Sequence, residues 1–266
     1  MYPVIIPSKS RPFSTIFREL PDATIVVEPQ EVATYRRLNP AHSIVVLPEN
    51  NRGLAYSRQF ILDMMRQQGV DWFWMIDDDV KYTYRVENGE TIKEPIKDVL
   101  ASAEIVITAV DGVALGALEY SQYAWGQKKP YALNSYCDVC VLLNASCTEP
   151  ARYRLDISLK EDRDFAMQVI ASGALTMRTS KFAFHSPKNG QNSGGLQPLY
   201  RTPGYEDEVC QRVVDYWGHG FCNLQTKKTG RRDLKINWRA LTRLGAAERF
   251  RRETLNTASN QCGVSL

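Results

Sequence analysis

The stretch Trp72-Phe73-Trp74-Met75-Ile76-Asp77-Asp78-Asp79 decides how the fold of this protein is interpreted. Its five large apolar residues predict a strand, and the earlier runs 25–27 and 44–47 are apolar at successive positions, as in parallel strands covered on both faces. Three acids follow directly where this strand ends. In an open parallel sheet, ligands bind just beyond the carboxyl ends of the strands. We therefore expect these acids to line a binding site.

The same acids predict a site for a divalent cation. Adjacent carboxylates repel one another, and Mg²⁺ or Mn²⁺ would relieve this repulsion, since such ions take oxygen ligands and bridge carboxylates to phosphates. Asp77 and Asp79 are two residues apart and can face one ion, whereas Asp78 points elsewhere. The alternative is a turn that the acids merely cap, because Asp is common in turns.

Strands alternate with helices on the N-terminal side of the acids. This order predicts an α/β fold, an open and mainly parallel sheet flanked by helices. We expect strands over 4–6, 24–27, 43–47 and 71–76, with helices over 13–20, 31–38 and about 54–68. Beyond the acids we expect a hairpin over 82–93, strands over 113–118, 139–143 and 175–184, and helices over 96–110, 162–171, 206–217 and 238–252. Residues 186–204 predict a long loop, and such loops often form lids over active sites.

Length and composition favour one α/β domain over residues 1–225, followed by a basic, helical segment with a disordered tail over 226–266. No apolar run reaches the roughly 18 residues that a membrane span needs. The start of the chain, Met1–Pro7, is typical of a first strand and not of a leader. Six cysteines without scaffold spacing indicate a reducing compartment. We therefore expect a cytoplasmic protein without membrane or protein partners.

Charge is distributed unevenly along the chain. Residues 226–252 carry ten Lys and Arg against Asp233 and Glu248, a net charge of +8, which leaves residues 1–225 at −4. A basic segment of this kind predicts a polyanionic partner, and DNA is the obvious one. Our candidate DNA-binding residues are Arg231, Arg232, Lys235 and Arg239. The alternative is a solvated helix or disordered tail without a partner.

A second motif, Asn50-Asn51-Arg52-Gly53-Leu54-Ala55-Tyr56-Ser57-Arg58, follows the third expected strand and opens the longest helix of the first half. Backbone N–H groups at a helix start, together with Arg58, can bind phosphate. This motif alone is not specific, because Asn and Gly are also ordinary residues at helix entries.

Together these segments resemble the GT-A fold of nucleotide-sugar glycosyltransferases over about residues 2–190. The resemblance implies a hexosyltransferase with a nucleotide-sugar donor, expected to be a UDP-sugar, and a divalent metal. The donor contacts it implies are Pro7, Ser8, Lys9 and Arg11 in the first loop, Glu28 near the base or ribose, Asn50, Gly53 and Arg58 at the helix entry, and Asp77 and Asp78 in the Asp-x-Asp motif.

The later part of the same resemblance supplies the chemistry. Glu161 and Asp162 resemble the acidic pair of which one member is the general base, although acids at a helix start also simply favour the helix dipole. His185 resembles a late metal ligand beside Asp77 and Asp79, although it can also be a hydrogen-bonded strand end. The donor-rich loop after His185 suggests that Lys188 clamps the diphosphate.

A narrower resemblance concerns the acceptor. The runs 7–9, 27–29, 47–50, 53–58 and 72–79 are similar to the TET/JBP-associated glycosyltransferases, a group that includes bacteriophage enzymes. This implies sugar transfer to a 5-hydroxymethylpyrimidine such as 5-hydroxymethylcytosine in DNA, and a location in the host cytoplasm if a bacteriophage encodes the protein. The aromatic residues at 123, 125 and 131 would then stack on the sugar or on an extruded base, or pack in the core.

Three alternatives remain open from the sequence. A GT-A enzyme could act on a protein, lipid or glycan acceptor. A phosphohydrolase could use the acids, although Lys81 stands where the corresponding motif has Thr or Val. The chain could also be an inactive DNA-binding module. The motif Cys137-Asp138-Val139-Cys140 is more typical of buried thiols than of zinc, which needs four ligands.

Overall fold

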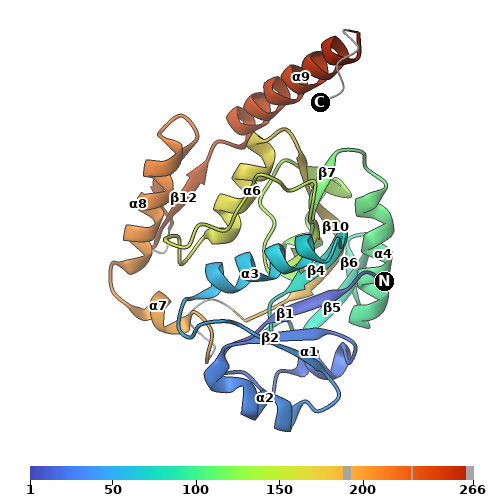
Figure 1. The fold of residues 1–266 in the computed structure, drawn as a ribbon, viewed down its shortest axis with the longest axis vertical. Coiled ribbons are helices and arrows are strands. Elements are labelled where there is room, and N and C mark those ends of the chain that lie inside the picture. Colours follow the sequence, from blue (N-terminus) through green and yellow to red (C-terminus); the bar gives the residue numbers. More distant parts are fainter. Residues whose placement is uncertain (188–192, 229, 262–266) are drawn as a thin grey trace.

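The structure, a computed structural model, describes residues 1–187, 193–228 and 230–261. Its core is a sheet in the order β3-β2-β1-β4-β9-β7-β10-β5-β6, with β8 paired to β10 (Figure 1). The strands are β1 (Val4–Pro7), β2 (Thr24–Val27), β3 (Ser43–Val46), β4 (Trp72–Ile76), β5 (Tyr82–Glu87), β6 (Glu90–Glu94), β7 (Val113–Tyr120), β8 (Tyr131–Leu133), β9 (Cys140–Asn144) and β10 (Leu175–His185).

The first half of the sheet is parallel, as the alternation of strands and helices predicts. β1 pairs in parallel with both β2 and β4, and β2 pairs in parallel with β3. The intervening helices are α1 (Thr15–Glu19), α2 (Val32–Leu38) after a short 3-10 turn over Pro29–Glu31, and α3 (Leu54–Gln67). The α/β fold class is confirmed. The second half adds antiparallel pairs, because β9 runs antiparallel to both β4 and β7.

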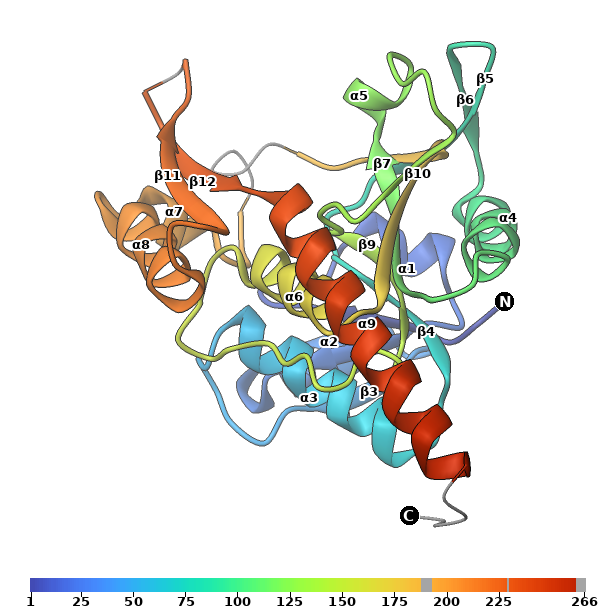
Figure 2. The ribbon, with the colours of Figure 1, turned by 90° about the horizontal axis from the view of Figure 1, so that it is seen from above.

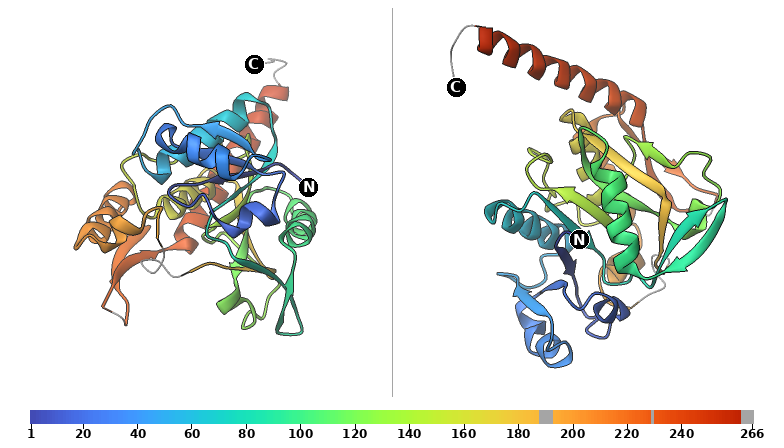
Figure 3. Two further views of the ribbon diagram at one scale, coloured as in Figure 1. Left: turned by 90° about the horizontal axis from the view of Figure 1, so that it is seen from below. Right: turned by 90° about the vertical axis from the view of Figure 1, so that its right-hand side faces the viewer.

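The apolar run of β4 is buried on both faces, which is why it lacks alternation. Trp74 and Ile76 belong to the core on the face covered by α1 and by α4 (Ile96–Thr108). Phe73 and Met75 belong to the core on the opposite face, against α3 and α6 (Glu161–Ala171). Figure 3 shows α4 and α3 on opposite sides of the sheet. Because packing on both faces fixes the position of β4, the acids that follow it are held in place.

The C-terminal part differs from the expected basic helix. β11 (Cys222–Thr226) and β12 (Arg232–Ile236) form a hairpin, so the predicted boundary at residue 225 falls inside a strand. The buried residues of this hairpin pack with α8 (Tyr205–Trp217) in a third core. In the sequence these apolar residues are separated by charged ones, so the two strands are not apparent. α7 (Gln197–Arg201) precedes α8.

The last helix is longer than the sequence predicts. α9 (Trp238–Gln261) continues beyond the expected end at residue 252 into the tail expected to be disordered, of which residues 262–266 lie outside the described ranges. It runs beside α6 (Figure 2). The two helices are so close that a Cβ on Gly245 would meet the carbonyl oxygen of Ile170. None of the helices in the described ranges has the length and apolar character that crossing a membrane requires.

Candidate active site

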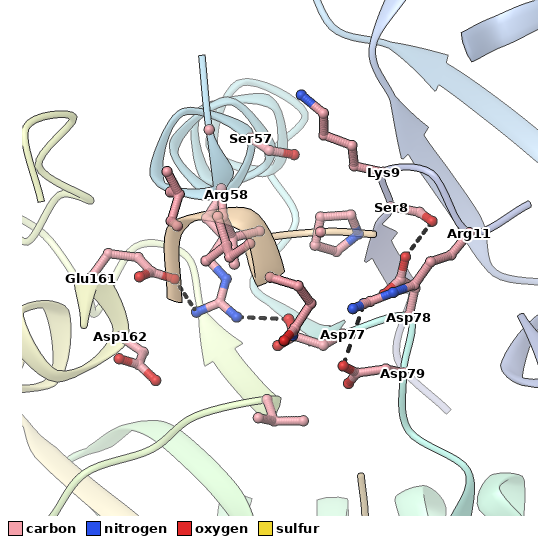
Figure 4. A pocket seen from close by; sticks show the side chains of 18 of the residues that line it. Ser8, Lys9, Arg11, Ser57, Arg58, Asp77, Asp78, Asp79, Glu161 and Asp162 are labelled. Atoms are coloured by element: carbon pink, nitrogen blue, oxygen red, sulfur yellow. Dashed lines mark hydrogen bonds and ion pairs between the residues drawn. The ribbon is translucent and has the colours of Figure 1, made fainter. Parts of the chain in front are cut away.

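A cavity of about 420 Å³ opens at the carboxyl ends of the parallel strands, between the starts of α3 and α6 (Figure 4). Most of the residues singled out in the sequence meet there. The lining comprises residues 7–9, 11, 28, 47, 51, 53, 54, 57, 58, 77–79, 120, 138, 139, 160–163 and 195–200. The described end of the long loop therefore closes one side, where Gly195 N donates to the Lys9 carbonyl at 3.1 Å.

Arg58 joins the two acidic motifs of the cavity. Its Nη2 donates to Asp77 Oδ1 at 2.7 Å, and its Nη1 lies 3.2 Å from Glu161 Oε1. Burial opposes the charge of this guanidinium, but the two carboxylates raise the pKa of Arg58 well above its usual value. The guanidinium is thus engaged by carboxylates, whereas the sequence suggests a phosphate contact for it.

The carboxylate of Asp78 is buried and paired with other side chains, so it is not positioned as a ligand of an ion. Ser8 Oγ donates to Asp78 Oδ2 at 2.5 Å, and Arg11 forms an ion pair with the same carboxylate. Burial raises the pKa of Asp78 to about 7, although Arg11 and Ser8 favour its charged form. The Arg11 guanidinium also lies 3.4 Å from Asp79 Oδ2. Arg11 therefore fixes the acidic run to the first loop.

One more ion pair lies in the cavity wall, between the loop after β1 and the end of β2. Lys9 Nζ lies 2.8 Å from Glu28 Oε1 and donates to Asn51 Oδ1 at 2.8 Å. Pro7 and Gly53 also line this part of the cavity. Asn50 does not, because its Oδ1 is turned to accept from the Gln30 backbone N–H at 3.0 Å. The helix-entry asparagine at the cavity is thus Asn51, one residue later than the resemblance implies.

The two candidate bases occupy different environments. Glu161 is buried against Arg58, and burial raises the pKa of its carboxyl. Asp162 is half-buried and lines the cavity, and its Oδ1 accepts from the Arg163 backbone N–H at 2.7 Å. Among the described residues, it forms no ion pair. Figure 4 shows Glu161 directed at Arg58 and Asp162 lying apart from this pair. Of these two acids, Asp162 is therefore the one whose carboxylate is not held by an ion pair within the described residues.

A third carboxylate at the cavity, Asp138, was not predicted from the sequence. It lines the cavity, is 4% exposed, and its Oδ1 has no hydrogen-bond partner within the part of the chain that the structure describes. Arg163 Nη2 lies 3.5 Å from the other oxygen. The next residue, Val139, has φ 62°, which is rare for a β-branched residue and marks local strain. Only the tertiary position distinguishes Asp138, since its motif has the composition of an ordinary strand start.

His185 is not brought to the acids. β10 pairs antiparallel with β5 and places His185 opposite Tyr82, whose ring stacks on the imidazole at 6.3 Å between centroids. His185 is exposed and is not among the residues that line the cavity. In the described ranges, no three His, Cys, Asp or Glu side chains form a group that could hold a metal ion. The predicted trio of ligands is therefore not assembled in this structure. Lys188 lies outside the described residues.

Two of the four candidate DNA-binding residues are engaged within the protein. Arg231 makes a two-pronged ion pair with Glu206, with Nε–Oε2 and Nη2–Oε1 distances of 2.7 and 2.5 Å. Arg232 lies 3.8 Å from Asp207. Lys235 and Arg239 are exposed. The charge count could not anticipate this, because the acids come from α8, which precedes the basic segment.

Comparisons with solved structures agree with this architecture. Residues 1–349 of S. aureus TarS superpose with a TM-score of 0.51 at 12% identity, over 80% of this chain and 64% of that one, so this chain spans less than two thirds of that structure. Glucosyl-3-phosphoglycerate synthase from Mycobacterium tuberculosis, solved with Mn²⁺, UDP and glucosyl-3-phosphoglycerate, gives a TM-score of 0.52 at 9% identity, over 89% and 87%. At such identities the likeness shows the fold alone, which both share with this chain.

Sequence comparison identifies the family. No curated protein sequence gives a match to the chain. The family model described as TET-Associated Glycosyltransferase matches residues 2–195, which include every cavity-lining residue up to Gly195. This match confirms the narrower resemblance expected from the motifs. The chain belongs to the TET-associated glycosyltransferase family.

Proposed function

We propose that this protein transfers a sugar from a UDP-sugar to the hydroxyl group of a 5-hydroxymethylpyrimidine in DNA. One observation carries the proposal: Asp77 and Asp79 from the end of β4 and Asp162 from the start of α6 line the same cavity. A donor diphosphate and an acceptor hydroxyl can therefore meet there. The presence of UDP in structures of TarS and of glucosyl-3-phosphoglycerate synthase supports the choice of nucleotide.

Asp162 supplies the proton transfer in this mechanism. Its carboxylate accepts the proton of the acceptor hydroxyl as the hydroxyl oxygen forms a bond with the anomeric carbon of the sugar. The bond from that carbon to the diphosphate oxygen breaks, and the nucleoside diphosphate leaves with the bonding pair. Arg58 keeps Asp77 in place beside the diphosphate through the 2.7 Å contact. We assign the nucleoside end of the donor to Lys9 and Glu28, which also line the cavity.

The donor set of the cavity fits a divalent ion only in part. Asp77 and Asp79 offer the carboxylate oxygens that Mg²⁺ and Mn²⁺ prefer, and both line the cavity. His185 does not join them, so we assign the two aspartates alone. When bound, such an ion would neutralise charge on the departing diphosphate. The synthase solved with UDP and Mg²⁺ or Mn²⁺ supports this assignment.

We expect Asp79→Ala to lower the transfer rate by about 10²–10³-fold, since a metal supplies several kcal/mol of charge stabilisation. EDTA should lower the wild-type rate to a similar extent, and added Mn²⁺ should restore it. The rates are measured as UDP release, with circular dichroism to check folding. Asp98→Ala, at an exposed acid of α4, is the matched control. Full activity of Asp79→Ala in the presence of EDTA would exclude the metal role.

A screen of donors and acceptors tests the proposed function itself. The full-length protein is incubated with UDP- and GDP-sugars and with oligonucleotides that contain 5-hydroxymethylcytosine, 5-hydroxymethyluracil or unmodified bases. Mass spectrometry should show a gain of one hexose on a hydroxymethylated base and none on the unmodified strand. Transfer to a protein, lipid or glycan, with none to DNA, would show that DNA is not the acceptor. The assignment as a glycosyltransferase would still hold.

The positions of the basic residues predict different effects on DNA binding. Lys235→Ala with Arg239→Ala should weaken DNA binding and lower the magnitude of its salt slope by about 0.9 for each phosphate that the variant no longer neutralises. Arg231→Ala with Arg232→Ala should act mainly on stability, because both arginines pair with α8. Fluorescence anisotropy at several salt concentrations measures the first effect, and urea unfolding the second. Equal weakening of DNA binding in both double variants would contradict this division.

A further inference from the structure

An exposed strip of aromatic and lysine side chains leads away from the cavity. We define the aromatic strip as residues 120–131, from the end of β7 through α5 (Ser121–Ala124) to the start of β8. Tyr123, Trp125 and Tyr131 are 52%, 64% and 41% exposed. Large aromatic side chains are normally buried or at interfaces, so three exposed ones within nine residues need an explanation.

The strip begins at the wall of the cavity itself. Tyr120, which precedes α5, lines the cavity. Its ring packs on Phe184 with 4.5 Å between centroids, and Tyr123 meets it edge-on at 6.3 Å. A chain of rings therefore continues from the sheet, past the cavity, to the surface.

The backbone of the strip is held by the sheet. Tyr131 and Ala132 pair with Thr179 and Arg178 of β10. Ser180 donates through its backbone N–H to the Pro130 carbonyl at 2.9 Å and through its hydroxyl to the Lys129 carbonyl at 2.5 Å. The Trp125 indole N–H donates to the Gln122 carbonyl at 3.1 Å, so its polar group is already satisfied. The exposed rings thus belong to an ordered surface.

The charge of the strip selects the kind of partner. Residues 121–136 contain no Asp or Glu, and Lys128 and Lys129 are both exposed. Within the described ranges neither lysine forms an ion pair. Flat rings beside lysines, in a segment that itself carries no acid, are the combination that binds single-stranded nucleic acid, through base stacking and phosphate contacts. A groove for a neutral glycan would not need the two lysines.

We propose that the aromatic strip is the surface on which an unpaired strand of the acceptor DNA stacks, with Lys128 and Lys129 against its phosphates. This inference rests on the proposed function and extends it, because a base inside a duplex cannot reach the cavity unless it is extruded. The strip would hold the bases next to the one entering the cavity past Tyr120. Figure 2 places α5 and the β11–β12 hairpin on two arms of the molecule, so the strip and the basic hairpin are separate contact regions.

Two variants and two matched controls test this surface in the full-length protein. Trp125→Ala removes a ring, and Lys128→Ala with Lys129→Ala removes both charges. Ile105→Ala, at a 73% exposed residue of α4, is the control for the first. Arg36→Ala with Arg37→Ala, at adjacent exposed residues of α2, is the control for the second. The probe is a fluorescein-labelled single-stranded oligonucleotide with one 5-hydroxymethylcytosine, and UDP binding is measured in parallel.

Trp125→Ala should weaken binding of the single strand about 10-fold, within the range for removal of one stacked base. The double lysine variant should lower the magnitude of the salt slope by about 1.4, or 0.7 per phosphate contact. UDP affinity and both controls should match the wild type. If both strip variants bind DNA with the affinity and the salt slope of the wild type, the aromatic strip is not the DNA-binding surface. The proposal that DNA is the acceptor would not be affected by this result. If the wild type itself neither binds nor modifies DNA but transfers sugar to another acceptor, the DNA part of the proposed function fails together with the strip.

Discussion

Asp162→Asn is expected to lower the rate of sugar transfer by about 10²–10⁴-fold, the usual contribution of general base catalysis. Asparagine keeps the shape of the side chain and can still accept from the Arg163 N–H, but it cannot take the hydroxyl proton. Since Asp162 forms no ion pair among the described residues, the substitution should leave the fold and UDP affinity unchanged. The rate is followed as hexose transfer to a hydroxymethylated oligonucleotide, and UDP binding by calorimetry.

Glu161→Gln is the comparison that separates the two acids. It should weaken the contact with Arg58 and so lower stability, while it leaves a working base at Asp162. We therefore expect the larger catalytic loss in Asp162→Asn and the larger change in unfolding midpoint in Glu161→Gln. If Asp162→Asn retained the wild-type rate while a folded Glu161→Gln protein was inactive, the base would have to be Glu161.

Arg58→Leu is expected to destabilise the protein by about 3–5 kcal/mol, the usual cost of leaving a buried carboxylate without its partner. Arg58 is 4% exposed, and Glu161 is buried beside it. Its removal would also release Asp77, so UDP binding should weaken in whatever fraction remains folded. Urea unfolding measures the first effect, and UDP titration of the folded protein the second.

A double substitution distinguishes the effect of the broken ion pair from that of poorer packing. In Arg58→Leu with Glu161→Leu the unpaired buried carboxylate is removed, and part of the stability should return. Arg52→Ala, which breaks an exposed pair with Glu49, should change stability by no more than about 1 kcal/mol. A cost for Arg58→Leu as small as that for Arg52→Ala would show that Arg58 does not hold the two motifs together.

Local sequence patterns determined the first half of the fold. The uninterrupted apolar run of β4, the alternation of strands and helices before it and the acids after it predicted a parallel sheet with a site at its carboxyl edge, and the structure has a parallel half-sheet with a cavity at that edge. These features depend on neighbouring residues, so they are visible in a single sequence. The same holds for the hairpin of β5 and β6, whose turn contains Asn88 and Gly89. The family match over residues 2–195 agrees with the motifs.

The β11–β12 hairpin was missed for a physical reason. Its buried residues, such as Leu234, are separated by charged ones, so the basic composition conceals the strands until α8 supplies the surface against which they pack. Arg231 and Arg232 were counted as free charge, yet Glu206 and Asp207 of α8 neutralise them. Partners that come from another element cannot be seen in a charge count.

The sequence by itself determined that three acids follow a buried strand and that Glu161 and Asp162 begin a later helix. Only the tertiary structure decided what each acid does. Arg58 lies between Asp77 and Glu161, so that of the acidic pair Asp162 alone lines the cavity without an ion pair to a described residue, and Arg11 pairs with the buried Asp78. Long-range packing sets these pairings, because burial makes an unpaired charge costly and the folded chain alone determines which partner is within reach.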